Sequence, residues 1–201
     1  DLYISNAVQQ GDASLSPEKN SAFKIGSRYR QTGFSVVLSG FYTHGKNMID
    51  WVQTTETELN DSKYHVMNIG KLDNMGFNVD AEIYMNELLP RCFVTNIRLG
   101  YAYINQNHET ETEILKSLYA LEYLRHKAVF GLDHKIWSKL SASWSVRWQQ
   151  RMNGYHPYTK VDCKVMWNDR KYSVYVKADN ITCHRYYDLS AVKQPGLWVM
   201  A

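Results

Sequence analysis

Strict alternation of apolar and polar residues is the feature of this sequence that most constrains its fold. In LSASWSVRWQQR (140–151), one parity holds only apolar residues: Leu140, Ala142, Trp144, Val146 and Trp148. The other parity holds serine, arginine and glutamine. Period-two alternation over this length predicts a β-strand with one apolar and one polar face. Such an apolar face can pack in the core of a soluble sandwich or face lipid.

The alternation recurs along the chain, and the sequence predicts nine strands and no convincing helix. The predicted strands are 23–30, 33–43, 76–85, 93–104, 116–137, 140–151, 160–168, 170–181 and 196–201. Only LKSLYALEYLRHK (115–127) also fits a helical stripe. Because aromatic residues continue on both sides of it without a cap or stop signal, a strand is favoured there.

The connections between these strands alternate between short and long. The short ones are 31–32, 86–92, 138–139 and 169–170, and the longer, more polar ones are 43–65, 105–113, 152–159 and 182–195. Short turns at one end and long loops at the other are typical of an up-and-down outer-membrane barrel. A Greek-key sandwich has no reason to sort its loops in this way. The apolar faces are therefore predicted to face lipid, with Trp137, Trp144, Trp148 and Trp167 as interfacial girdle residues.

The composition agrees with this prediction and excludes several other classes. No run of about 18 apolar residues is present, so no transmembrane helix is expected. The formal net charge of +3 is spread along the chain and gives no reason to expect nucleic-acid binding. The three cysteines, Cys92, Cys163 and Cys183, are too few and too far apart for a disulfide framework.

The chemistry-bearing residues do not form a recognisable catalytic or metal-binding motif. Seven histidines show no HxH or HExxH spacing. The acidic run HETETE (108–113) could hold a cation such as calcium, but a solvated loop is the simpler interpretation. We therefore expect no enzymatic activity, no metal site and no cofactor.

Four sequence segments, in order, resemble markers of a known family. They are LSPEKNSAFKIGSRYR (15–30), GFYTHGKNMIDWV (40–52), LDNMGFNVDAEIY (72–84), and ADNITCHRYYD (178–188) followed by PGLW (195–198). Their order and spacing resemble the TonB-dependent outer-membrane receptors, with some similarity to cobalamin receptors. One departure is Asn78, which stands where the family usually has glutamate, so the role of that glutamate is in doubt here.

The resemblance implies an all-β fold in the bacterial outer membrane. Residues 1–201 would be the C-terminal part of a large transmembrane up-and-down β-barrel, and the resemblance implies 22 strands. Single-chain bacterial barrels have even strand numbers, so the nine predicted strands form only part of one. A plug domain and a segment that contacts TonB are expected before Asp1. The implied partners are a small-molecule or metal-chelate ligand, TonB and outer-membrane lipid, and a capping surface lipoprotein is left open.

The implied function is import of a scarce solute: a ferric siderophore, another iron chelate or cobalamin. The candidate ligand contacts at the outer mouth are Asn105, Arg151, Tyr155, His156, Tyr186 and Tyr187. Two other functions stay open at this point. A passive porin would lack the plug, and a soluble carbohydrate-binding β-sandwich would need no lipid.

Overall fold

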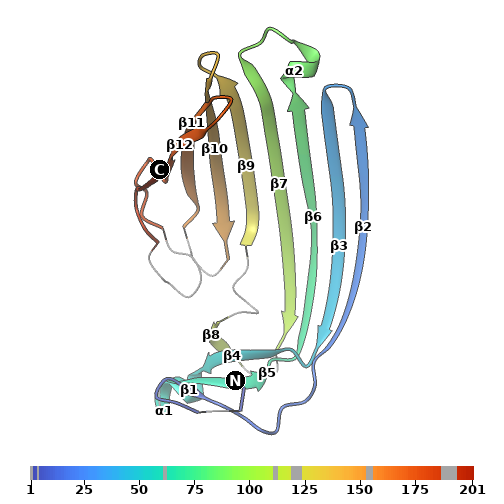
Figure 1. The fold of residues 1–201 in the computed structure, drawn as a ribbon. Coiled ribbons are helices and arrows are strands. Elements are labelled where there is room, and N and C mark those ends of the chain that lie inside the picture. The colour runs from blue at the N-terminus through green and yellow to red at the C-terminus, as the bar shows by residue number, and fades with distance from the viewer. Residues whose placement is uncertain are drawn as a thin grey trace. The chain divides into compact units, whose positions relative to one another are not determined.

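A sheet of nine strands dominates the structure, which is a computed structural model (Figure 1). The structure describes residues 2–3, 5–60, 63–110, 113–118, 124–152, 156–186 and 194–201. The strand order is β13-β12-β11-β10-β9-β7-β6-β3-β2, so strands that follow one another along the sheet also follow one another in the chain. The strands are β2 (Lys19–Gln31), β3 (Phe34–Lys46), β6 (Lys71–Tyr84), β7 (Val94–Glu109), β9 (Leu124–Lys135), β10 (Leu140–Arg151), β11 (Tyr158–Asn168), β12 (Ser173–Asp179) and β13 (Trp198–Met200).

The cross-strand register confirms that the sheet has one apolar and one polar face. Residues directly opposite each other in an antiparallel pair project to the same face. Trp144 lies opposite Leu132 on β9 and Cys163 on β11. One residue further, Ser145 lies opposite Gly131 and Asp162. The predicted two-faced strand 140–151 is therefore present, and its neighbours continue both faces.

The apolar face stays exposed rather than packing against a second layer. Leu99, Phe130 and Trp167 retain 46%, 39% and 41% of their accessible surface. In a soluble sandwich such residues would be covered by the opposing sheet. The exposure of a continuous apolar face agrees with the prediction that it contacts lipid.

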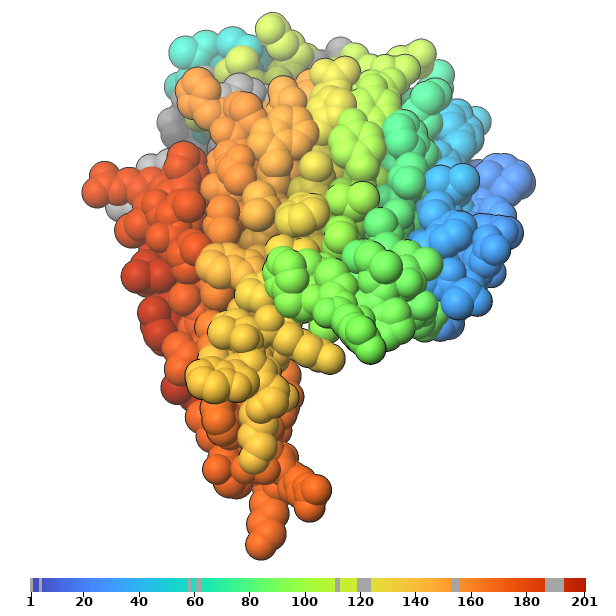
Figure 2. All heavy atoms as spheres, turned by 90° about the horizontal axis from the view of Figure 1, so that it is seen from above, coloured from blue at the N-terminus to red at the C-terminus, as the bar shows by residue number. Residues whose placement is uncertain are grey.

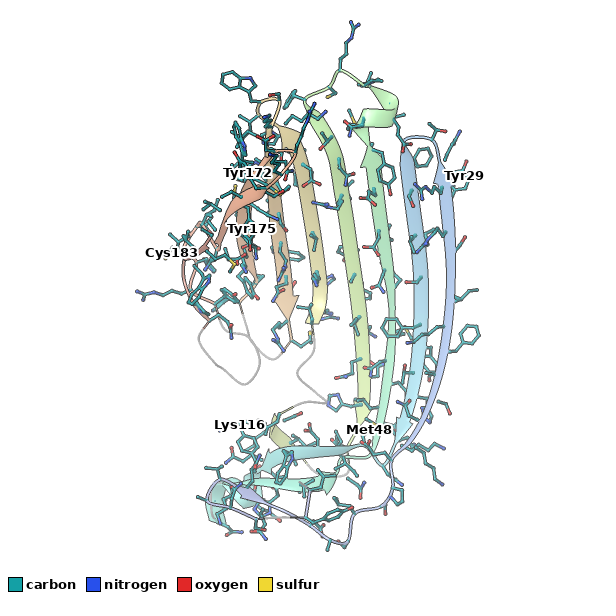
Figure 3. The ribbon with its side chains drawn as sticks, viewed as in Figure 1. Tyr29, Met48, Lys116, Tyr172, Tyr175 and Cys183 are labelled. Carbon is teal, nitrogen blue, oxygen red and sulfur yellow. The ribbon has the colours of Figure 1, made fainter. Side chains whose placement is uncertain are left out.

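Aromatic side chains gather on this apolar face. Tyr103 lies between Phe77 and His126, with ring centroids 5.8 and 5.0 Å away, and His126 is followed by Trp148 at 6.2 Å. Toward the short connections, Tyr29 and Tyr172 are both exposed; Figure 3 labels them. Two groups of rings near opposite strand ends match the paired girdles of membrane barrels.

The predicted alternation of short and long connections is confirmed. The short connections are 32–33, 85–93 with helix α2 (Met85–Leu88), 136–139 and 169–172. The long ones are 47–70, 110–123, 152–157 and 180–197. Seen from above, the sheet passes from blue at one side through green and yellow to red at the other (Figure 2).

The chain divides into two compact units, and each is described by itself. Unit 1 comprises residues 1–25, 40–76 and 104–123, and unit 2 comprises 26–39, 77–103 and 124–201. Unit 1 contains a second sheet of order β1-β5-β4-β8, and helix α1 follows β4. These elements are β1 (Gln9–Gln10), β4 (Ile49–Thr54), α1 (Thr55–Asn60), β5 (Tyr64–Asn68) and β8 (Ile114–Ser117).

A small core holds this second sheet together. Val52, Ile69 and Leu72 are buried, and Met48, Met67 and Ile114 pack against them. Figure 3 labels Met48 and Lys116 in this part of the chain. The long connections thus carry ordered structure of their own.

Three predictions about local structure were wrong. The single strand predicted over 116–137 consists of β8 and β9, with residues 119–123 outside the described part of the chain. The two short helices were not expected, and 43–65 was predicted as a loop although it holds the end of β3, all of β4 and the start of β5. Because β4 is buried almost throughout, both of its faces are covered and it shows no alternation to detect.

No helix among the described residues is long and apolar enough to cross a membrane.

Adjacent residues of β10 give a test of the lipid-facing assignment. Val146→Lys places a charge on the apolar face and is expected to lower the free energy of unfolding by about 2–4 kcal/mol near the bilayer midplane. Ser145→Lys, on the polar face beside Asp162, is expected to have little effect. The measurement is denaturant unfolding of the full-length protein in lipid vesicles. Equal effects of the two lysines would contradict the assignment.

Candidate functional site

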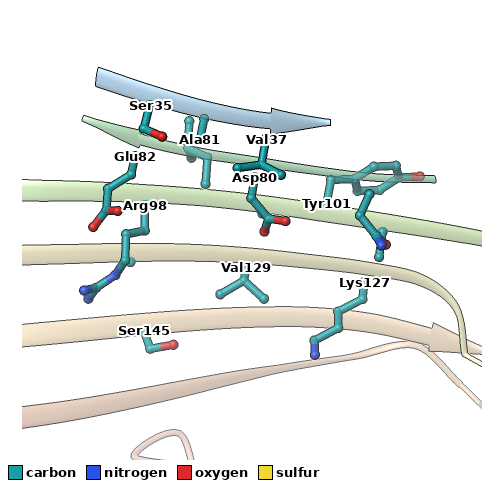
Figure 4. A pocket seen from close by; sticks show the side chains of 15 residues that line it. Ser35, Val37, Asp80, Ala81, Glu82, Arg98, Tyr101, Lys127, Val129 and Ser145 are labelled. Atoms are coloured by element: carbon teal, nitrogen blue, oxygen red, sulfur yellow. The ribbon is translucent and has the colours of Figure 1, made fainter. Parts of the chain in front are cut away.

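The polar face of unit 2 carries a hollow of about 420 Å³ (Figure 4). This volume lies within the range of small-molecule sites. Figure 4 shows Asp80, Glu82, Arg98 and Lys127 around it, contributed by β6, β7 and β9. The lining residues are Ser35, Val37, Asn78, Asp80, Ala81, Glu82, Arg98, Leu99, Gly100, Tyr101, Ala102, Lys127, Val129, Gly131 and Ser145.

Two glycines let charged side chains lie flat on the floor of this hollow. A Cβ atom at Gly131 would lie 2.9 Å from Arg98 Nε, and one at Gly100 would lie 3.1 Å from Asp80 Oδ1. Arg98 passes over Gly131 and makes a two-pronged ion pair with Asp133, with Nη1–Oδ2 at 2.9 Å and Nη2–Oδ1 at 3.1 Å. The forked geometry fixes the guanidinium in a single orientation.

The acidic side of the hollow is also held by hydrogen bonds. Glu82 accepts one from Asn96 Nδ2 at 2.7 Å and one from the Tyr84 hydroxyl at 2.8 Å. Asn78 Nδ2 donates to Ser39 Oγ at 3.4 Å, so at this position an amide bonds a hydroxyl on the neighbouring strand. The result is a wall of fixed polar groups with separate acidic and basic parts.

An aromatic cluster lies on the polar face where β10 and β11 meet the long connections. Tyr158, the first residue of β11, is buried, and its hydroxyl accepts a hydrogen bond from Gln149 Nε2. The ring of Tyr186 stacks on that of Tyr158 with centroids 4.5 Å apart and planes 26° apart. His184 lies against the same ring at 6.3 Å. The segment after β12 therefore packs onto the polar face.

Asn180 anchors this segment. Its Nδ2 donates to the carbonyls of His184 at 2.9 Å and Pro195 at 3.3 Å, and its Oδ1 accepts from the His184 amide at 3.1 Å. Its own amide donates to Asp162 Oδ1 at 2.8 Å. Asn180 also has φ +54°, a conformation that asparagine tolerates better than most residues. This geometry explains why asparagine opens the NITCHRY stretch.

The exposed ends of β3, β6 and β7 in unit 1 carry paired charges. Asp73 accepts a hydrogen bond from the Tyr42 hydroxyl at 2.8 Å and lies 2.7 Å from His44 Nδ1. The hydrogen bonds from His44 and then Tyr42 lower the pKa of Asp73. Lys71 pairs with Glu109 at 2.9 Å, and that hydrogen bond raises the pKa of Lys71.

Within the described ranges, no group of three His, Cys, Asp or Glu side chains could hold a metal ion.

The six predicted contact residues lie at different places. Asn105 is half-buried in β7 and belongs to unit 1. By strand alternation it shares the apolar side of Tyr103 rather than the polar side of Arg98. Arg151 is the half-buried last residue of β10, and His156 is exposed before β11. The remaining three are Tyr186, stacked on Tyr158, and Tyr155 and Tyr187, which lie outside the described residues.

The sequence analysis missed the residues that line the hollow. Asp80, Glu82, Arg98 and Lys127 were recognisable only as polar positions of alternating strands. Their proximity depends on the register between β6, β7 and β9, which no single strand encodes. A glycine on the polar side of a strand is the one local signal, since it marks a place where a neighbouring side chain can lie flat.

These features define the wall of an outer-membrane β-barrel, with lipid outside and a polar lumen inside. Residues 1–181 match the family model for the TonB dependent receptor-like β-barrel, and the chain belongs to this family. Members of the family are outer-membrane transporters rather than enzymes. The soluble β-sandwich considered from the sequence is therefore wrong.

Solved structures show the same fold at low sequence identity. The FrpB iron transporter from Neisseria meningitidis (F5-1 variant, apoprotein form) matches 96% of this chain with TM-score 0.70 and 14% identity, over 32% of its own length. The copper transporter OprC matches 92% with TM-score 0.69 and 14% identity, over 30% of its length. The siderophore receptor PirA from Pseudomonas aeruginosa matches 98% with TM-score 0.64 and 17% identity, over 32% of its length. The chain thus spans about a third of the length of these proteins.

The flat packing of Arg98 over Gly131 can be tested by substitution. Gly131→Ala is expected to push Arg98 away from Asp133, because the new Cβ would lie 2.9 Å from Nε. A double-mutant cycle with Arg98→Gln and Asp133→Asn should give a coupling of about 0.2–1 kcal/mol with Gly131 and nearly none with alanine. The free energy of unfolding of the full-length protein is the measurement. Unchanged coupling in the alanine background would refute this account of Gly131.

The anchoring role of Asn180 predicts how easily the following segment is cleaved. Asn180→Ala removes both hydrogen bonds donated by Nδ2 and both accepted by Oδ1, so trypsin should cut after the exposed Arg185 several times faster. Thr182→Val, which loses only a 3.4 Å hydrogen bond to Asn180, is the control and should leave the rate nearly unchanged. The readout is the cleavage rate in isolated outer membranes, and equal rates for both variants would show that Asn180 does not anchor the segment.

Proposed function

We propose that this chain forms part of the barrel wall of a receptor that imports a scarce metal chelate or cobalamin across the outer membrane. The observation that carries the proposal is the hollow of fixed charged groups on the polar face of strands whose other face is apolar and exposed. A passive wall needs no such fixed groups, whereas a ligand site does. Membership of the TonB-dependent receptor family supports active import.

The relatives support a metal-bearing solute. The matching structures include an iron transporter, a copper transporter and a siderophore receptor. A ferric siderophore or another iron chelate is therefore the first choice of ligand. Cobalamin remains the second choice, on the resemblance of the sequence alone.

The partners follow from the same proposal. TonB would supply energy through a segment that precedes this part of the barrel, and outer-membrane lipid would cover the apolar face. A surface lipoprotein over the long connections is a further candidate partner. Arg151, Tyr155, His156 and Tyr187 are proposed as ligand contacts near the mouth. Asn105 stays a weaker candidate because it lies on the side of Tyr103.

Tyr186 combines two roles in this proposal. One face of its ring stacks on Tyr158, and the residue remains only half-buried. The accessible part of the side chain can contact a ligand while the stack holds the ring in place. Stacked aromatic rings are suited to this because they present apolar area at little entropic cost.

Uptake of radiolabelled iron by cells separates active import from passive diffusion. Cells that produce the full-length receptor are expected to accumulate a ferric siderophore, and deletion of the receptor or of TonB should reduce accumulation to background. A panel of chelates and cobalamin identifies the ligand. Uptake that persists without TonB would instead support the passive porin.

A further inference from the structure

Three cations lie close together on the polar face of β9, β10 and β11. Arg147 lies directly opposite Lys160, and on its other side it lies opposite Val129. Lys127 lies opposite Gln149, which places it diagonally from Arg147. Like charges directly opposite each other destabilise a strand pair, and long side chains also reach diagonal neighbours. A group of three neighbouring like charges requires a physical explanation.

Other cations of the same face have partners. Arg98 pairs with Asp133 at 2.9 Å, and Lys177 pairs with Asp179 at 2.9 Å. Lys164 lies directly opposite Lys177, and its ammonium rests over the ring of Tyr175 at 4.5 Å. Figure 3 labels Tyr175 on β12. In these places the fold supplies a carboxylate or an aromatic face for each charge.

The group of three has much less compensation. Arg147 Nε is buried and has no hydrogen-bond partner among the described residues. Among the described residues, the carboxylate that pairs with Lys160 is that of Asp162, with Nζ 3.4 Å from Oδ1, and the same Oδ1 accepts a hydrogen bond from the Asn180 amide at 2.8 Å. A buried donor left without an acceptor destabilises the folded state, and more so when the donor is charged. An external acceptor would remove this cost.

Space for such an acceptor is available beside the cations. Lys127, Val129, Gly131 and Ser145 all line the hollow of about 420 Å³, and three of these four side chains are small or absent. The acidic groups of the hollow, Asp80 and Glu82, belong to β6, with β7 between β6 and β9. An anion is therefore attracted toward β9–β11 and repelled from β6.

We propose that Lys127, Arg147 and Lys160 bind an oxyanion of the imported solute: a carboxylate, catecholate or phosphate oxygen. This inference rests on the proposed function and narrows it to chelates that carry negative charge. The guanidinium of Arg147 donates in two directions, and the two ammonium groups add charge without a fixed angle. The site would thus recognise the negative charge of the chelate, and the long connections would recognise its shape.

The test measures binding of tripolyphosphate to the full-length receptor in detergent by isothermal titration calorimetry. Arg147→Gln and Lys160→Gln are each expected to weaken binding by about tenfold or more, because each removes a charge-assisted contact. Lys164→Gln is the matched control: the same substitution on the same face of β11, at a lysine already held by Tyr175, should change binding less than twofold. Binding should also weaken as salt is raised.

Two outcomes would overturn the inference. The first is equal binding by the native receptor and both variants, or no binding at millimolar tripolyphosphate. The second is a lower melting temperature of the variants with unchanged binding of tripolyphosphate. That result would show that the cations pair with an acidic side chain of the receptor itself. Either can occur while TonB-dependent uptake is normal, so failure here is distinguishable from failure of the proposed function.

Discussion

The requirement that every backbone N–H and C=O group be paired inside a membrane determines this structure. Unpaired groups cost several kcal/mol each in hydrocarbon, so a spanning sheet must be closed. In the nine-stranded sheet, β2 and β13 are the edges, and each is paired on one side only. Further strands must complete the barrel. The relatives, about three times as long as this chain, belong to a family that supplies them.

Pairing also separates the two faces and so determines where function can lie. Each strand of the wall gives alternate residues to lipid and to the lumen, and the lipid side tolerates few charges. Polar chemistry is therefore confined to the lumen side and to the connections. Gly100 and Gly131 extend what the lumen side can do, because they allow Asp80 and Arg98 to lie flat and leave room above them.

The sequence predicted the nine strands because period-two alternation is a local property, and it predicted their order because short connections join neighbours. The second sheet was missed because β4 is covered on both faces, so its residues do not alternate. The site was missed for a different reason. The stacking of Tyr186 on Tyr158 and the placement of Arg147 opposite Lys160 depend on how separate segments align, and the sequence of one strand carries no such register.

The same distinction explains why Tyr186 was selected and Tyr158 was not. Tyr186 lies in a long connection, where exposed aromatic residues suggest binding, whereas Tyr158 sits at the start of a strand and resembles a wall residue. Their stacking shows that the connection and the wall form one surface at this point. Asn180 maintains that surface by bonding the connection to itself, while its amide bonds Asp162 of the wall. Asp162 also pairs with Lys160 at 3.4 Å, so the anchor of this connection and the cation group in the lumen share one carboxylate.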